Sequence, residues 1–441
     1  MKNRLFAEID NAPLILFRIF FGFLLACETL GAILTGWVNK NFVEPEFLFT
    51  HIGMDVLQNL SGSGMYFYFV TMGLLGFAVM LGYKYRWTLG LFTLMWGGVY
   101  FAQKTSYNNH YYLLLLVCLI MLFLPANRYA SIDAKQNPSL KKLTMPAWCS
   151  WVMIAQVAIV YFYATIAKFY PGWLDGTFTK NLLTAHTSGA FHEIAIQKWF
   201  YMFIAYTGIA FDLLVVPLLL YKRTRTIALI ASVIFHLFNS ITLEIGIFPF
   251  FALSFVVFFY PPERIRQIFF KKKPVVENYH TTQEKRSVLL YFFIPYFIIQ
   301  LALPIRHHFI EGNVFWTEEG HRLSWRMMLR SRNGYTYFKV TNKENNAPIT
   351  YNLSENLTRK QIRSMQTKPD MIWQTAQRIK NEFNEIGIDV AVHATTRAGI
   401  NGAPTKTLID AEVDLATAKW EYFSHNKWVL LYDDEGNIIQ Q

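Results

Sequence analysis

The sequence predicts an α-helical polytopic membrane bundle followed by a β-rich extramembrane domain with helical insertions. Hydrophobic residues make up 53% of the 441 residues, and the mean hydropathy of +0.22 is too high for a soluble globule of this size. Apolar blocks recur to about residue 305 and then stop. We therefore expect a transmembrane helical domain at 1–305 and an extramembrane domain at 306–441.

Nine apolar stretches are candidates for membrane-spanning helices. The first is too long for the apolar region of a cleavable signal peptide, so we expect it to stay in the protein. Several others have only about 16 residues, or roughly 24 Å of helix, which is short for a hydrocarbon core of about 30 Å. Eight spans is therefore the alternative count. The stretches are 12–36, 65–83, 87–102, 110–125, 147–168, 199–221, 226–241, 245–260 and 287–305.

The distribution of basic residues predicts the orientation of the bundle. When alternate loops are assigned to opposite sides, only Lys40, Lys104, Lys180 and Lys198 lie on the side away from the N-terminus. By the positive-inside rule, the N-terminus is cytoplasmic and, with nine spans, the C-terminal domain lies on the outer, periplasmic or lumenal side. The net charge of +11 thus reflects topology and predicts no nucleic-acid partner. We expect the basic run at 271–286 to contact acidic lipid.

Unusual polar residues gather at the outer ends of three predicted helices. Taken singly, each has an ordinary explanation, such as a lysine snorkelling at the interface or a satisfied core histidine. Because unpaired polar groups are costly in lipid, their convergence at one level predicts a functional site. The residues are Asn108, Asn109 and His110 at the start of the fourth stretch, Lys168 at the end of the fifth, and His236, Asn239 and Glu244 near the end of the seventh.

These side chains favour proton chemistry on a lipid-soluble acid. A lysine in a dry pocket loses proton affinity and can act as a neutral base, while amides and imidazole can stabilise an oxygen anion. No metal site is predicted, because His110 and His236 lie in separate spans and neither an HExxH nor a CxxC motif occurs. Two further charged residues inside apolar stretches, Glu28 and Asp212, have no assigned role.

The polar C-terminal part combines strand and helix patterns. Alternation of apolar and polar residues predicts strands at 335–340 and 388–393, and helical periodicity predicts an amphipathic helix at 368–383. None of the three cysteines lies in this part, so no disulfide framework is expected.

Seven segments resemble vitamin K-dependent γ-glutamyl carboxylases, in order and along nearly the whole chain. In the apolar part they are QKTSYNNHYYL, VYFYATIAKFYPGWLDG and FHLFNSITLEIGIFPF. In the polar part they are SWRMMLRSRNGYTYFKV, ITYNLSENLTRKQ, PDMIWQTAQRIKNEF and LIDAEVDLATAKW. Vertebrate members carry a disulfide in the extramembrane region, and the absence of cysteine there makes this chain similar to a bacterial-type member.

The resemblance implies a γ-glutamyl carboxylase, a carbon–carbon lyase that converts protein glutamate to γ-carboxyglutamate with reduced vitamin K, O2 and CO2 and forms the quinone epoxide. Lys168 matches the family's base for the hydroquinone, and Asn109 and His110 match the pair that orients the reacting oxygens. We expect Asn108, His236 and Asn239 to help bind the quinone.

The implied cofactor is a quinol of the menaquinol or phylloquinol type, with no metal. Its implied partners are a glutamate-containing protein or peptide, membrane lipid, the lipid-soluble quinone itself and a quinone-regenerating reductase. The alternative is a non-carboxylating quinone-binding, transport or structural protein on the same membrane scaffold. A transporter would more naturally bury charge at the membrane midplane and show inverted repeats.

Overall fold

The computed structural model describes residues 2–243, 246–277, 279–282, 286–327, 329–433 and 435–439. The predicted polar residue Glu244 lies outside these ranges. The chain divides into two compact units. The helical unit comprises Met1–Lys40, Ser63–Tyr100 and Asn108–Leu301, and the C-terminal unit comprises Asn41–Gly62, Phe101–Tyr107 and Ala302–Gln441. The boundaries predicted for the membrane and extramembrane domains remain a prediction.

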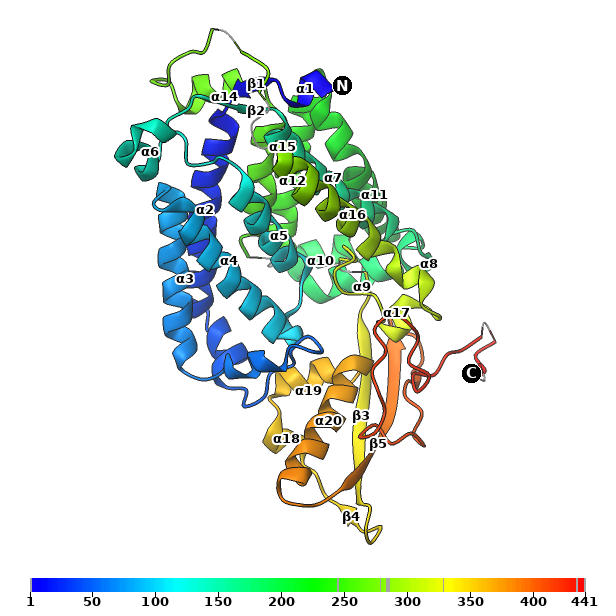
Figure 1. Cartoon of the computed structure of the whole chain (residues 1–441). Coiled ribbons are helices and arrows are strands. Elements are labelled where there is room, and N and C mark those ends of the chain that lie inside the picture. Colours follow the sequence, from blue (N-terminus) through cyan, green and yellow to red (C-terminus); the bar gives the residue numbers. More distant parts are fainter. Residues whose placement is uncertain are drawn as a thin grey trace. The chain divides into compact units, whose positions relative to one another are not determined.

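Each of the nine predicted apolar stretches contains a helix (Figure 1). Within the described residues, six helices are long and apolar enough to cross a membrane, and two apolar helices, Asn109–Phe123 and Phe248–Phe258, are shorter. The choice between eight and nine spans therefore remains a prediction. The nine helices are α2 (Ala12–Leu34), α3 (Gly64–Leu81), α4 (Tyr85–Ala102), α5 (Asn109–Phe123), α7 (Trp148–Ile166), α11 (Lys198–Leu220), α12 (Arg225–Leu243), α13 (Phe248–Ser254) and α16 (Ile294–Ala302).

Short elements connect these helices. Strands β1 (Glu8–Asp10) and β2 (Thr144–Pro146) form an antiparallel pair. The short helices of this unit are α1 (Lys2–Leu5), α6 (Ile132–Gln136), α8 (Pro171–Leu174), α9 (Thr177–His186), α10 (Gly189–Ala195), α14 (Pro262–Phe269) and α15 (Arg286–Val288).

Helices α2 and α3 approach closely because glycines face each other. A Cβ atom added at Gly22 of α2 would lie 2.3 Å from the backbone nitrogen of Met80, and one added at Gly76 of α3 would lie 2.6 Å from that of Ala26. Small residues let helix backbones approach in this way and replace the hydrophobic driving force that lipid does not supply.

We expect Gly22→Ala to destabilise the protein, whereas Gly31→Ala in the same helix should not. The added methyl at position 22 meets backbone atoms that cannot move aside, and such overpacking costs about 1–3 kcal/mol. Nothing lies within 4 Å of a Cβ atom at Gly31, so alanine there gains helix propensity only. Thermal unfolding of the two purified variants in detergent would test this expectation. Equal melting temperatures would contradict the close approach of α2 and α3.

Two charged residues of α2 find partners on or near α5. The buried Arg18 side chain donates hydrogen bonds to the carbonyl oxygens of Ala126 at 2.9 Å and Ala130 at 2.5 Å. Glu28, which the sequence left without a role, forms a hydrogen bond with the Tyr111 side chain. Both side chains thus have hydrogen-bond partners within the helical unit, which lowers the cost of placing them among apolar helices.

One lysine of the basic run at 271–286, which follows α14, is part of a buried ion pair. Lys273 is buried, and its ammonium forms an ion pair with the fully buried Asp10, which also pairs with Arg266 at 3.2 Å. The Lys273 Nζ atom donates a second hydrogen bond to the Leu143 carbonyl at 2.8 Å. The prediction that the run at 271–286 contacts lipid is therefore wrong for Lys273, because a buried carboxylate requires a cationic partner.

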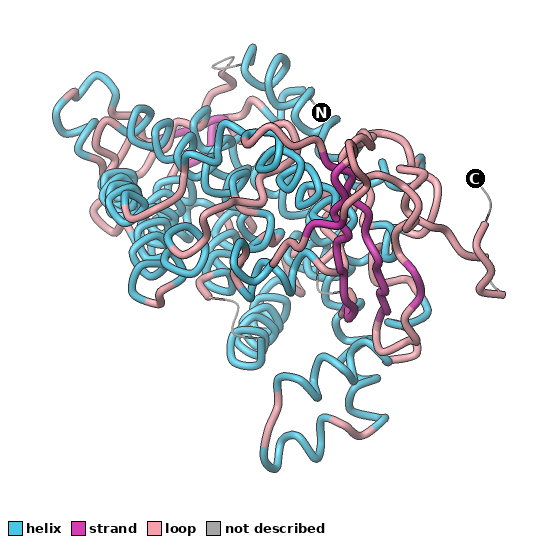
Figure 2. The backbone as a smooth tube through the Cα atoms, turned by 90° about the horizontal axis from the view of Figure 1, so that it is seen from below, coloured by secondary structure: helices cyan, strands magenta, loops and turns pink. Residues whose placement is uncertain are grey.

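The C-terminal unit contains a four-stranded antiparallel sheet in the order β4-β3-β5-β6. Its two long strands are β3 (Arg332–Asn342) and β5 (Val390–Ile400), which pair along their whole length (Figure 2). The other elements are β4 (Pro348–Ile349), β6 (Lys406–Thr407), α17 (Val314–Thr317), α18 (Leu353–Asn356), α19 (Arg359–Met365) and α20 (Pro369–Glu385).

One core joins the helices of this unit to the sheet. Met371 and Ile379 of α20 and Val392 and Ala394 of β5 are fully buried in the same cluster. The predicted strand at 335–340 and the predicted helix at 368–383 are confirmed to within three residues at each end. The predicted strand at 388–393 is confirmed as a strand, but β5 continues to Ile400, because its pairing with β3 extends beyond the alternating stretch. The unit is mixed rather than β-rich, since the four helices α17 to α20 accompany a sheet of two long and two short strands.

Candidate functional site

The polar run before α5 starts the helix. Asn108 is the N-cap, and its side-chain oxygen accepts a hydrogen bond from the Tyr111 backbone nitrogen at 2.8 Å. Asn109 follows and is buried. The His110 ring stacks on Phe248, the first residue of α13, with ring centroids 3.7 Å apart. Asn108 thus has a structural function, and its role in quinone binding remains a prediction.

His236 of α12 meets the same phenylalanine. Its ring lies 6.2 Å from Phe248, edge to face, and its Nε2 atom lies 3.1 Å from the hydroxyl of Tyr161 on α7. The Nδ1 atom of His236 is buried and has no hydrogen-bond partner in the part of the chain that the structure describes. Asn239, one turn further along α12, is half-buried. Phe248 therefore brings His110 and His236 together.

Lys168 is held by a carboxylate. It follows the C-terminal end of α7, and its Nζ atom lies 2.5 Å from Asp212 Oδ2 of α11 and 3.1 Å from the Ala164 carbonyl oxygen. The Lys168 and Asp212 side chains are 10% and 7% exposed. The Trp173 ring lies 5.2 Å from the ammonium. The sequence predicted a dry pocket for Lys168, and the structure adds the negative charge of Asp212.

Aromatic side chains connect the ion pair to the two histidines. Phe211, which precedes Asp212 on α11, lies 5.9 Å from the rings of both Tyr161 and His236. Tyr161 is also within electrostatic range of Asp212. Lys168, His110 and His236, which are far apart in sequence, thus belong to one cluster on α5, α7, α11, α12 and α13 of the helical unit.

Two family models match the chain. The HTTM domain matches residues 6–263, which is more than half of the chain, and the lumenal domain of vitamin K-dependent gamma-carboxylase matches residues 285–435. The chain belongs to the vitamin K-dependent carboxylase family. No solved structure matches this chain. The cluster of the helical unit lies wholly within the first matched region, at residues 110–248.

The cluster of this carboxylase-family chain fits a flat, hydroxylated ring such as reduced vitamin K. Flat rings are available at the His110–Phe248 stack and at the Phe211–Phe235 stack, whose centroids are 3.9 Å apart. The buried Nδ1 atom of His236 can exchange a hydrogen bond with a phenolic hydroxyl, which would satisfy it. A buried lysine–carboxylate pair can hold or release a proton. The residues present therefore fit the cofactor that the family name implies.

Sequence reasoning missed the roles of two members of the cluster. Asp212 is the one acidic residue in the apolar helix α11. Because a charged side chain inside the membrane is costly, such a residue usually pairs with another group at a functional site. Its partner could not be named because Lys168 is 44 residues away. Tyr161 gave no comparable signal, because it is one of several aromatic residues near the end of α7.

Proposed function

We propose that this chain uses reduced vitamin K, O2 and CO2 to convert glutamate residues of a protein or peptide to γ-carboxyglutamate, with formation of the quinone epoxide. The single observation that supports this proposal best is the buried Lys168–Asp212 pair beside His236 in a chain that matches both family models. A menaquinol- or phylloquinol-type cofactor and a quinone-regenerating reductase belong to the same proposal.

We propose that Lys168 removes a proton from the hydroquinone. In its neutral form the Nζ atom accepts the proton, and the Asp212 carboxylate at 2.5 Å stabilises the ammonium that results. The Trp173 ring lies 5.2 Å from the ammonium and both side chains of the pair are buried, so little water can weaken this electrostatic interaction. When bound, reduced vitamin K supplies the electrons for reduction of oxygen and the strong base for the glutamate γ-proton.

We propose that His110 and Asn109 orient the reacting oxygens and that His236, Asn108 and Asn239 help hold the quinol. The His110 ring is fixed by its stack on Phe248, and His236 is fixed by Tyr161. Fixed donors and acceptors stabilise developing charge because they need no reorganisation during the reaction.

The proposed function can be tested on the purified protein in lipid nanodiscs. The reaction would contain a reduced naphthoquinone, a glutamate-containing peptide and labelled bicarbonate, and both label uptake and quinone epoxide would be measured. We expect both products, and neither with Lys168→Ala. Epoxide without label uptake would indicate a quinol oxidase that does not carboxylate, and absence of both from folded protein would overturn the proposal.

We also propose that the N-terminus is cytoplasmic and that the C-terminal domain lies on the outer side. The name of the second matched family model, a lumenal domain, supports this orientation. Ser424 is exposed in the C-terminal unit, so Ser424→Cys should react with a membrane-impermeant thiol reagent in intact cells or spheroplasts. The unsubstituted chain is the control, because its cysteines lie at positions 27, 118 and 149. Labelling only after lysis would show that the C-terminal domain lies on the cytoplasmic side, the opposite of the proposed orientation.

A further inference from the structure

The loop before α5 belongs to the C-terminal unit. This entry loop, Phe101–Tyr107, ends where Asn108 begins the last segment of the helical unit. Lys104 in its middle is 1% exposed, and a lysine is almost never buried so completely without a charged partner. The Lys104 backbone nitrogen donates to the Phe49 carbonyl at 2.7 Å, and its carbonyl accepts from the Tyr107 nitrogen at 3.1 Å. The entry loop is therefore a fixed part of the C-terminal unit and not a free linker.

A buried carboxylate holds Lys104. Asp370, the second residue of α20, accepts hydrogen bonds on Oδ2 from Lys104 Nζ at 2.5 Å and from an Arg322 nitrogen at 2.7 Å. Its Oδ1 atom accepts a second bond from Arg322 at 3.3 Å. Asp370 is 3% exposed, so water cannot replace either cation, and removal of one partner leaves buried charge incompletely paired. Lys104 therefore stays at Asp370, and the entry loop stays with it.

Tyr107, at the end of the entry loop, is held at its hydroxyl and at its ring. The hydroxyl oxygen accepts a hydrogen bond from the Leu323 backbone nitrogen at 2.7 Å, and the Arg322 guanidinium lies 5.8 Å from the ring. Leu323 has a φ of +61°, a conformation that is costly for any residue with a side chain and persists only where neighbouring contacts enforce it. The hydrogen bond to Tyr107 is one such contact, so the position of Tyr107 is well defined.

The segment 318–323, which contains both partners of Tyr107, is fixed by two buried carboxylates. Glu318 is 6% exposed and forms an ion pair with Arg332 at 3.2 Å. Glu319 is 5% exposed and accepts hydrogen bonds from the backbone nitrogen of Asn426 at 2.8 Å and from its side-chain nitrogen at 2.7 Å. The segment therefore cannot shift without breaking buried polar contacts, which is costly.

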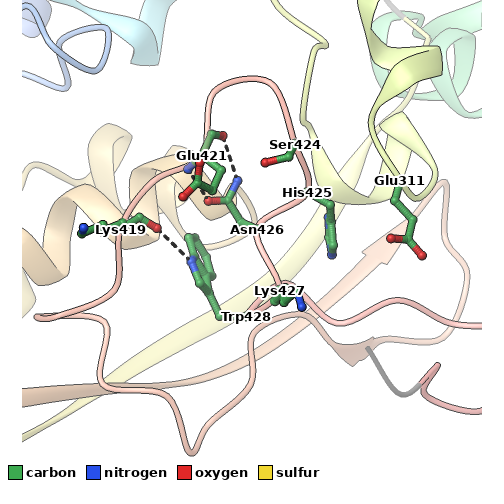
Figure 3. Close-up of a pocket in the computed structure, with 8 residues that line it drawn as sticks. All are labelled: Glu311, Lys419, Glu421, Ser424, His425, Asn426, Lys427 and Trp428. Carbon is green, nitrogen blue, oxygen red and sulfur yellow. Dashed lines mark hydrogen bonds between the residues drawn. The ribbon is translucent and has the colours of Figure 1, made fainter.

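The loop that carries Asn426 is held together by its own hydrogen bonds. Figure 3 shows the Asn426 side-chain nitrogen donating to the Glu421 carbonyl at 3.2 Å and Trp428 Nε1 donating to the Lys419 carbonyl at 3.4 Å. Glu319 is therefore held by a loop that is itself fixed. A continuous series of contacts leads from this loop, through the segment that contains Glu319, to the entry loop.

The backbone carries this position from Tyr107 to Asn109 and His110. They are the second and third residues after Tyr107, and Asn108 is the single residue between the entry loop and α5. Asn108 cannot absorb a shift without losing the helix cap, in which its side-chain oxygen accepts from the Tyr111 nitrogen at 2.8 Å. Because consecutive Cα atoms stay about 3.8 Å apart, a displacement of Tyr107 reaches both residues.

We propose that Lys104 and Tyr107 are positioning residues for the Asn–His pair at the start of α5. Through them the C-terminal unit fixes the loop from which this helix begins. The inference rests on the proposed function, in which that pair, Asn109 and His110, orients the reacting oxygens. A misplacement of about 1 Å can cost about 10²-fold in rate. Neither positioning residue is among those proposed to hold the quinol, so its loss should lower kcat more than it changes KM.

The first test measures kcat and KM for a reduced naphthoquinone with the full-length protein in nanodiscs. Lys104→Met should lower kcat at least tenfold and change KM less than threefold. Lys104→Arg, which keeps the charge and can pair with Asp370, should restore kcat to within threefold of the unsubstituted protein. The control is Lys343→Met, which removes a cation that pairs with Asp414 at 3.3 Å in the same unit and should change kcat less than twofold.

The second test needs no turnover. Hydrogen–deuterium exchange reports how firmly the first turn of α5 is held, because the Tyr111 amide donates to the Asn108 side chain. We expect exchange there to rise at least fivefold in Lys104→Met. It should rise as well in Tyr107→Phe, which removes only the hydroxyl that accepts from Leu323 and should lower kcat at least threefold. Exchange in the middle of α7 should not change.

Three results would contradict the inference: unchanged kcat in folded Lys104→Met, no rescue by Lys104→Arg, or exchange at the start of α5 that rises in neither variant. Equal rises in α5 and α7 would also contradict it, because they would show a general loss of stability. If Lys104→Met does not fold, the rate and exchange of Tyr107→Phe decide the question. If the folded, unsubstituted protein forms no product, the proposed function is wrong, while the exchange rates still show whether the entry loop holds the start of α5.

Discussion

Lys168→Arg should lower product formation as far as Lys168→Ala does, by about 10³-fold or more, if Lys168 is the base for the hydroquinone. Arginine keeps the positive charge and could still pair with Asp212, but it does not give up its proton in the accessible pH range. General base catalysis contributes about 10²–10⁴-fold, so loss of the base should show directly in the rate. The measurement is the initial rate of epoxide formation and label uptake at equal protein concentration.

Chemical rescue provides the control for Lys168. A small amine added to Lys168→Ala can enter the space of the lost side chain and accept the proton, so part of the activity should return. The same amine should not rescue Lys168→Arg, because the guanidinium fills the space beside Asp212. Full activity of the arginine variant would mean that Lys168 anchors an anion or the helix end by its charge, and the proposed base would be wrong.

His110→Ala should lower product formation by about 10²-fold or more, with little change in yield or melting temperature. The ring is fixed on Phe248 and sits beside the buried Asn109, where a donor or acceptor can stabilise developing charge on oxygen. Removing one such preorganised group costs about 10²–10³-fold in kcat in other enzymes. The same assay reports the rate, and thermal unfolding reports the stability.

A matched control for His110 is His186→Ala, since His186 is exposed on α9 and lies outside the cluster. It should leave the rate within about twofold, as expected of a surface substitution. If His110→Ala protein is lost from the membrane or melts at a much lower temperature, the histidine has a structural role in packing α5 against α13.

Local properties of the sequence were enough to predict the elements. Apolar length and the position of polar breaks predicted the nine helical stretches, and alternation predicted β3 and β5, because both patterns depend on neighbouring residues only. Lys168, His110 and His236 were selected in the same way, since a polar residue in an apolar stretch is visible without knowledge of its partner. The burial of Lys273 against Asp10 was not visible, because the two residues are 263 positions apart.

Tertiary structure alone decided which groups meet. The sequence contained Asp212, Tyr161 and Phe248, but only the packing of α11, α7 and α13 brings their side chains to Lys168, His236 and His110. In the C-terminal unit, Lys104 and Asp370 are 266 residues apart and come from a loop between helices and from the start of α20. Hydrophobic patterns specify the buried face of a helix, whereas the pairing of polar groups across helices depends on crossing geometry that no local pattern contains.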